Sequence, residues 1–191
     1  MNWLPKYNYI LASKSPRRQQ LLKSLGLEFE VRMKEVDEIY PENLEMEKIP
    51  VFLAELKSKA FQNELTENDL LICADTIVCI HDKVLGKPKN SYEAREMLME
   101  LSNMVHHVIT GVSLSSLGKT KSFYSVTKVW FKDLNNNEID YYISTYKPFD
   151  KAGSYGIQDW IGVCKVDRIE GSYSTVMGLP IHRLYEELMK F

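Results

Sequence analysis

The strongest strand signal in the chain is the stretch Leu70-Leu71-Ile72-Cys73-Ala74-Asp75-Thr76-Ile77-Val78-Cys79-Ile80. Two apolar runs separated by only two polar residues predict a buried strand of the kind found in α/β sheets. Asp75 is expected at the end of the first run, where α/β proteins place ligands and catalytic groups. The alternative interpretation is a turn aspartate that accepts hydrogen bonds from its own backbone.

The segments on either side of this stretch alternate between predicted strands and predicted helices. Ser15 is a suitable N-cap and Pro16 a suitable first residue for a helix that ends near Leu25, before Gly26. Further helices with apolar residues at helical spacing are predicted from Pro50 to about Leu65, after Asn90, over Ile139–Tyr146 and from Pro180. Further strands are predicted at Tyr9–Ala12, at Phe29–Val31, over Val105–Ser115, over Lys121–Phe131 and near Ile161–Val166. The order predicts an α/β fold with a mixed sheet, in a single domain spanning residues 1–191.

The composition excludes several classes of protein. Of the 191 residues, 45% are hydrophobic and 26% are charged, which is typical of an ordinary globular domain. The net charge of −2 offers no general attraction for nucleic acid or for an anionic membrane. No apolar run approaches the ~20 residues that span a bilayer, and the N-terminus lacks the apolar segment of a signal peptide. The three cysteines are therefore expected to be reduced thiols in a cytoplasmic protein.

Arg17 and Arg18 stand in the first turn of a predicted helix, where the helix dipole disfavours cations. The same turn offers free backbone N–H groups and the hydroxyl groups of Ser13 and Ser15. Together these donors and charges favour an anion-binding site, in particular one for a phosphate. The alternative is that both guanidinium groups extend into solvent or pair with nearby carboxylates.

Two lysines are further candidates for contacts with an anion. Lys57 lies near the middle of the apolar arc of its predicted helix, whereas Lys59 lies on the polar side. A buried ammonium must reach the rim, pair with an acid or face a ligand cavity. Lys87 follows Gly86 in a constrained loop, a pattern that is also common in surface turns.

Two loops carry polar groups of a different kind. Asp37-Glu38 could supply oxygen ligands to a divalent cation, although a solvated acidic loop is the simpler interpretation. The loop from Lys151 to Gln158 contains two glycines, which let backbone approach a flat ligand. Its Gln158 amide could recognise the edge of a nucleobase, or the loop could be only a flexible connection.

Taken together, these motifs closely resemble the Maf (septum-formation) family of nucleoside triphosphate pyrophosphatases. The resemblance extends from about Ile10 to Leu188 and rests on the segments Leu11-Ala12-Ser13-Lys14-Ser15-Pro16-Arg17-Arg18, Ala74-Asp75-Thr76, Leu85-Gly86-Lys87-Pro88, Ala152-Gly153-Ser154-Tyr155-Gly156-Ile157-Gln158 and Met177-Gly178-Leu179-Pro180. It implies an inosine-triphosphatase-like fold, with an elongated mixed sheet flanked by helices and a cleft between two lobes. It also implies hydrolysis of a nucleoside triphosphate to the monophosphate and pyrophosphate, with Mg²⁺ or Mn²⁺ as cofactor.

The same resemblance assigns roles to individual residues. It makes Asp75 the proton acceptor and, together with Glu38, a metal ligand. It implies that the substrate is recognised by Arg17, Thr76 and Gln158 and that the phosphates are bound by Ser13, Arg18, Lys57 and Lys87. The loop ending in Gln158 is similar to the branch that acts on dTTP and UTP, including modified pyrimidine triphosphates in a housecleaning role.

The chain departs from the family pattern at two places. The family often has Lys-Ala at the helical lysine, whereas this chain has Lys57-Ser58 followed by Lys59-Ala60. The family usually has glycine after Gln158, whereas this chain has Asp159-Trp160, which adds a negative charge beside the amide.

Two alternatives concerning activity therefore stay open. One is activity on 7-methyl-GTP or another purine nucleotide, and another is a nucleotide-sensing regulator of cell division without strong turnover. The sequence is compatible with a homodimer but does not fix the oligomeric state. The expected partner is the nucleoside triphosphate substrate, with neither nucleic acid nor a membrane as a main partner.

Overall fold

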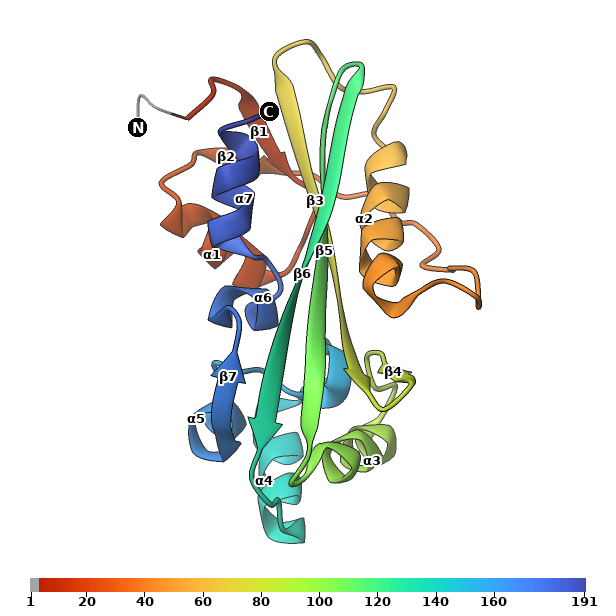
Figure 1. The fold of residues 1–191 in the computed structure, drawn as a ribbon, viewed down its shortest axis with the longest axis vertical. Helices are drawn as coiled ribbons and strands as arrows, with labels where there is room; N and C mark the ends of the chain where they lie inside the picture. Colours follow the sequence, from red (N-terminus) through yellow and green to blue (C-terminus); the bar gives the residue numbers. More distant parts are fainter. Residues whose placement is uncertain (1–3) are drawn as a thin grey trace. The chain divides into compact units, whose positions relative to one another are not determined.

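The computed structural model describes residues 4–191 and confirms the predicted α/β class with a mixed sheet flanked by helices (Figure 1). The strands are β1 (Asn8–Leu11), β2 (Phe29–Val31), β3 (Asp69–Ile80), β4 (Lys83–Leu85), β5 (Val105–Ser116), β6 (Lys119–Phe131) and β7 (Val166–Glu170). The α-helices are α1 (Pro16–Ser24), α2 (Ile49–Lys59), α3 (Ser91–Leu101), α4 (Asn136–Tyr146), α5 (Trp160–Lys165), α6 (Tyr173–Met177) and α7 (Ile181–Leu188). Two short 3₁₀ turns, η1 (Met46–Lys48) and η2 (Ala152–Ser154), complete the described elements.

Within residues 4–191, seven strands pair in the order β2-β1-β3-β5-β6-β7, with β4 paired to β3. β1 is parallel to both β2 and β3, whereas β4 and β7 are antiparallel to their partners. None of the helices in this part of the chain is long and apolar enough to cross a membrane. In the described part of the chain Cys73, Cys79 and Cys164 are free cysteines, the first two buried and the third exposed.

The described chain divides into two compact units, and three strands contribute residues to both. Unit 1 consists of residues 4–75, 110–125 and 178–191, and unit 2 consists of residues 76–109 and 126–177. Asp75 is therefore the last residue of one segment of unit 1, and Thr76 is the first residue of unit 2.

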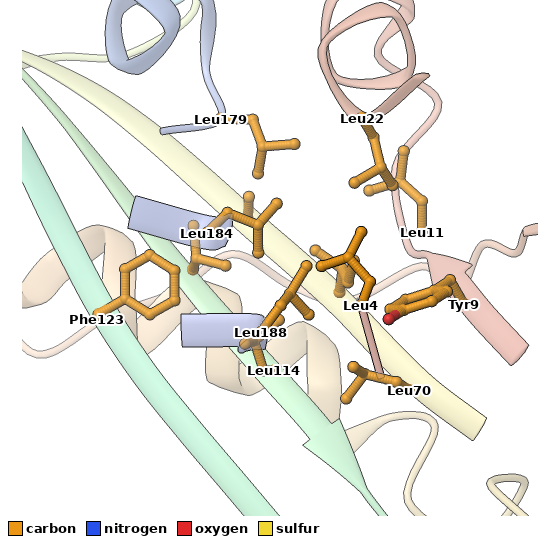
Figure 2. Close-up of a cluster of buried hydrophobic side chains, with 13 residues drawn as sticks. Leu4, Tyr9, Leu11, Leu22, Leu70, Leu114, Phe123, Leu179, Leu184 and Leu188 are labelled. Atoms are coloured by element: carbon orange, nitrogen blue, oxygen red, sulfur yellow. The ribbon is translucent and has the colours of Figure 1, made fainter. Parts of the chain in front are cut away.

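The core of unit 1 forms because β3 buries both of its faces. Side chains alternate along a strand, so Leu70, Ile72 and Ala74 join one cluster with Leu22 of α1 and Leu184 of α7 (Figure 2). Leu71 and Cys73 point to the opposite face, where they join Ala54 of α2 and the following Phe61. Helix α2 thus packs on the opposite face of β3 from α1 and α7 (Figure 1). Asp75 has the same parity as Cys73 and so belongs to the face that α2 covers.

Unit 2 carries the remaining helices and the loops that precede and follow them. Asn90 caps α3 by accepting a hydrogen bond from the backbone of Glu93, as its sequence predicted. Asn135 and Glu138 form a capping box at α4. Buried residues of α3 and α4, such as Leu98 and Tyr142, anchor these helices in the unit.

Three sequence predictions are wrong in detail. Helix α2 ends at Lys59 instead of near Leu65, because the following residues form tighter turns in which the N–H of Phe61 bonds to Ser58 and that of Gln62 to Lys59. The segment predicted as a strand at Ile161–Val166 is mainly helix α5, and β7 begins only at Val166. The apolar residues there belong to a helix of six residues. Because so short a helix does not show a helical period in the sequence, the segment was predicted as a strand.

The third correction concerns the position of Asp75. It lies in the interior of β3, which continues to Ile80 with β4 as an antiparallel partner, and not at the strand end. The parallel partner β1 stops earlier, since its last residue Leu11 pairs with Ile72. Asp75 therefore lies beyond the carboxyl end of β1, which is the edge where ligands bind in parallel sheets.

Candidate functional site

The centre of the candidate site is the ammonium group of Lys57, which contacts two carboxylates. Its Nζ lies 2.5 Å from Oδ1 of Asp75 and 2.8 Å from Oε1 of Glu38. The side chains of Lys57 and Asp75 are only 16% and 10% exposed, whereas that of Glu38 is 43% exposed. This arrangement explains why a cation occupies the apolar arc of α2: it pairs with an acid of the neighbouring strand.

Helix α2 is held against the sheet by contacts on both sides of Lys57. The buried hydroxyl of Ser58 donates a hydrogen bond of 2.6 Å to Oγ of Ser115 in β5. Near the start of the helix, Pro50 packs so closely on Gly111 that no side chain fits between them. Lys59 is exposed, whereas Lys57 contacts Asp75, so Lys57 is the lysine of α2 that faces the candidate site.

Arg18 adds a second cation from the first turn of α1. Its Nε donates a hydrogen bond of 2.8 Å to the carbonyl of Gly178, and its Nη1 lies 3.5 Å from Oγ of Ser13. The N-cap Ser15 accepts from the backbone N–H of Arg18, and its own N–H donates to Ser13 Oγ at 3.2 Å. The predicted N-cap at Ser15 is therefore present, and the carbonyl of Gly178 fixes the direction of the guanidinium.

The pKa of Arg18 is affected by the nearby carboxylates of Asp75 and Glu38. Burial lowers the pKa of Arg18, and the negative charges of Asp75 and Glu38 counteract this by raising it. Arg17, in the same helical turn, lowers the pKa of Arg18 through charge repulsion. The charge of Arg18 thus lies close enough to Arg17, Asp75 and Glu38 to be affected by all three.

Cys73 precedes Asp75 by two residues and lies on the same face of β3. Burial raises the pKa of its thiol to about 12, although Lys57 and Arg18 act in the opposite direction. The thiol is therefore protonated near neutral pH and is a poor nucleophile. Asp75 is the better candidate for the reacting group on this face.

The donor atoms in unit 1 suit a hard divalent cation. Asp75 and Glu38 direct carboxylate oxygens to one point, which the Lys57 ammonium occupies. Mg²⁺ and Mn²⁺ prefer such oxygen ligands and commonly complete their coordination with water and substrate phosphate. Among residues 4–191 no group of three or more histidine, cysteine, aspartate or glutamate side chains could hold a metal alone. A cation held by these two acids would therefore need oxygen atoms from water or a ligand.

Unit 2 contains the other predicted residues, and two of its loops are directly linked. The N–H of Gly153 donates a hydrogen bond of 3.1 Å to the carbonyl of Gly86, next to Lys87. Gly153 has a positive φ of 65°, and a Cβ there would meet the side chain of Val78, so glycine is required. Lys87 is exposed, and Thr76 is partly buried in β3.

Gln158 is held by a network that sequence reasoning missed. Its Nε2 donates a hydrogen bond of 2.9 Å to Oδ1 of Asp159, and Tyr142 donates one of 2.6 Å to Oδ2 of the same carboxylate. Lys151 Nζ lies 3.8 Å from Asp159 Oδ2. The departure from the family pattern after Gln158 was the only signal that could have revealed this network. Tyr142, which donates to Asp159, was recognised in the sequence only as an apolar position of the helix α4.

The structure thus groups the predicted residues by unit. Unit 1 brings together Ser13, Arg17, Arg18, Glu38, Lys57 and Asp75. Unit 2 holds Thr76, Lys87 and Gln158. The roles of all these residues stay predictions.

Comparison with known proteins assigns the family. The family model described as Maf-like protein matches residues 8–191, and the chain belongs to this family. It is 53% identical over 185 residues to a dTTP/UTP pyrophosphatase of Flavobacterium johnsoniae, covering 97% of this chain and 95% of the relative. It is 52% identical over 188 residues to a dTTP/UTP pyrophosphatase of Phocaeicola vulgatus, covering 98% and 97%. Among solved structures, the Staphylococcus aureus Ham1 protein aligns with 65% of this chain and 71% of its own, with 16% identity and a TM-score of 0.48.

Proposed function

We propose that the protein is a nucleoside triphosphate pyrophosphatase that hydrolyses dTTP and UTP to the monophosphate and pyrophosphate. The observation that carries this proposal is the contact of Asp75 with Lys57, beside Arg18 at the start of α1. The names of the relatives, about half of whose residues are identical to this chain, support the same reaction and the same substrates.

The cations of unit 1 are suited to binding a chain of phosphates. Arg18 offers a fork of N–H donors, and the dipole of α1 adds a partial positive charge at the N-terminal end of the helix. Lys57 supplies a compact charge beside the reacting group. Phosphoryl-type transfer depends mainly on positioning and charge stabilisation, so such a cluster is the chemistry that the reaction needs.

Asp75 acts as the proton acceptor for the attacking water. Its carboxylate is largely buried and contacts the ammonium of Lys57, which holds it in place on this face of β3. The water attacks the α-phosphorus in line with the bond to the β-phosphate. Pyrophosphate leaves as that bond breaks, while the nucleoside monophosphate gains the new oxygen.

Asp75 and Glu38 would hold the divalent cation. When bound, such an ion supplies positive charge to the phosphate oxygens and neutralises the charge that develops on the leaving group. Lys57 contacts both acids and keeps them in position.

The proposal is tested by incubating the protein with Mg²⁺ and, separately, UTP, dTTP, CTP and 7-methyl-GTP. Pyrophosphate release is measured as phosphate after addition of inorganic pyrophosphatase. We expect turnover to be highest with UTP and dTTP. Release of pyrophosphate from none of the four overturns the proposal and favours a nucleotide sensor, whereas turnover of 7-methyl-GTP alone overturns the assigned substrates.

The matched variant for this assay is Asp75→Asn, which keeps the shape of the side chain and removes the proton acceptor. We expect turnover to fall roughly 10²–10⁴-fold, the range for loss of a general base. The far-ultraviolet circular dichroism spectrum should stay unchanged. Near-normal turnover of this variant would exclude the role of Asp75.

A further inference from the structure

Asp159 occupies the N-cap position of α5, yet its side chain makes no capping hydrogen bond. Aspartate at an N-cap usually accepts from the first turn of its helix. Here both carboxylate oxygens are used elsewhere, Oδ1 by the Gln158 amide and Oδ2 by the hydroxyl of Tyr142. The Asp159 side chain is only 13% exposed, so these contacts are shielded from water.

The direction of each hydrogen bond in this network is fixed by the backbone. The N–H of Gly156 donates to the hydroxyl oxygen of Tyr142 at 3.0 Å, so the hydroxyl proton is directed to Asp159. Burial raises the pKa of Tyr142, which keeps that proton in place. An ionised carboxylate only accepts, so the group of Gln158 that faces Asp159 must be its NH₂ and cannot be its carbonyl.

The orientation of the Gln158 amide has a consequence for its oxygen. Oε1 is shielded from solvent, and no group among residues 4–191 donates a hydrogen bond to it. Buried carbonyl oxygens without a partner are uncommon in native proteins and call for an explanation. A ligand that brings an N–H group to this oxygen would supply the missing donor.

We propose that Asp159 is a positioning residue that turns the Gln158 amide so that it offers a nucleobase its carbonyl oxygen, which selects uracil and thymine over cytosine. This inference rests on the proposed function. Uracil and thymine carry an N–H at position 3 beside a carbonyl at position 4, whereas cytosine carries a bare nitrogen at position 3 beside an amino group. The fixed amide pairs its oxygen with the N–H and its second N–H with the carbonyl, and cytosine would need the reverse orientation.

The test is the variant Asp159→Asn. The hydroxyl of Tyr142 still donates to the oxygen of the new side chain, so the new NH₂ group faces Gln158. The Gln158 amide must then turn over and offer its own NH₂ to the base. We expect the ratio of kcat/KM for UTP to that for CTP to fall roughly tenfold or more, the effect of exchanging a made hydrogen bond for an unpaired group.

Two further variants separate positioning from a merely structural role. Asp150→Asn, in the same loop and beside the same Lys151, removes an equal charge without touching Gln158, and its ratio should stay at the wild-type value. In the double variant Gln158→Glu/Asp159→Asn, the new amide at position 159 donates to the new carboxylate at position 158, which reverses the hydrogen bond between them. A carboxylate oxygen at position 158 still faces the base, so the preference for UTP should return. If Asp159 has only a structural role, Asp159→Asn lowers kcat/KM for UTP and for CTP by the same factor. An unchanged ratio of the two would therefore overturn the inference.

Binding provides a readout that does not depend on turnover. Dissociation constants for UTP and CTP are measured by calorimetry in an Asp75→Asn background, with and without Asp159→Asn. If the wild type hydrolyses UTP, and Asp159→Asn leaves the UTP-to-CTP ratios of kcat/KM and of the dissociation constants unchanged, this inference alone is overturned. A protein that neither binds nor hydrolyses these nucleotides overturns both this inference and the proposed function.

Discussion

The ammonium of Lys57 lies 2.5 Å from Oδ1 of Asp75, although the two residues are 18 positions apart and come from a helix and a strand. Each residue alone is out of place: a lysine on an apolar helix face and an aspartate inside a buried strand. Burying an unpaired charge is costly, so the pair explains both anomalies at once. The pair fixes the Asp75 carboxylate on the face of β3 that α2 covers.

Replacing Lys57 by methionine tests the electrostatic role of this pair. Lys57→Met keeps most of the length of the unbranched side chain and removes a positive charge beside the reacting group. We expect kcat/KM for UTP to fall roughly 10²–10³-fold, the effect of losing one preorganised electrostatic contact. Steady-state kinetics measure it, and Lys59→Met, an exposed lysine of the same helix, should stay within about twofold of wild type. Equal losses in the two variants would contradict a specific role for Lys57.

Glu38→Gln tests the proposed metal ligand. An amide oxygen carries no charge and binds a hard cation more weakly than a carboxylate. We expect the Mg²⁺ concentration for half-maximal activity to rise roughly tenfold, with little change in activity at saturating Mg²⁺. Titration of activity with Mg²⁺ after treatment with a chelator measures this shift. Asp37→Asn, which changes the neighbouring exposed acid, is the control, and an identical curve for wild type and Glu38→Gln would refute metal binding by Glu38.

The sequence was informative where local physics determines the structure. Ser15, Pro16 and Gly26 predicted the limits of α1 because capping and glycine conformations depend on neighbouring residues only. The out-of-place charges of Lys57 and Asp75 predicted a site because the cost of burial does not depend on knowing the partner. The family resemblance supplied roles that such reasoning could not assign.

The sequence was uninformative where a contact joins distant segments. The hydrogen bond from Arg18 to Gly178 spans 160 positions and leaves no local pattern. Asp159 was visible as an added charge, but its contact with Tyr142 was not, because tyrosine at an apolar helix position is expected to be simply buried. The end of α2 was misjudged since the turns after Lys59 are set by the packing of Phe61 and not by a helix-breaking residue.

Gly111→Ala tests the packing that positions α2. Replacing a glycine in a strand by alanine normally stabilises by about 0.4–1 kcal/mol, because the unfolded chain loses freedom. At Gly111 a Cβ would lie 2.3 Å from the carbonyl carbon of Pro50, so we expect the opposite sign. Overpacking of this kind costs about 1–3 kcal/mol of the free energy of unfolding, measured by urea denaturation. Gly86→Ala, where a Cβ meets nothing within 4 Å, should change it by less than about 0.5 kcal/mol.

His106 gives the protein a defined sensitivity to acid. Its ring is buried in unit 2, with Nε2 2.7 Å from the hydroxyl of Tyr155, and burial together with the charge of His107 lowers its pKa to about 3. In the unfolded chain the pKa is about 6.5. Between these values only the unfolded state binds the proton, so the free energy of unfolding falls as the pH falls, by up to about 1.4 kcal/mol per pH unit.

Removing both partners of this hydrogen bond should therefore abolish that part of the pH dependence. The double variant His106→Phe/Tyr155→Phe keeps two aromatic rings and leaves no buried polar group without its partner. Urea denaturation at pH 7, 6, 5 and 4 should show that wild type loses stability relative to this variant below pH 6.5, with no relative change above it. His182→Gln, which alters an exposed histidine, should keep the wild-type slope. Parallel curves for wild type and the double variant would mean that His106 takes up its proton equally in both states, and its burial would then not control the acid sensitivity.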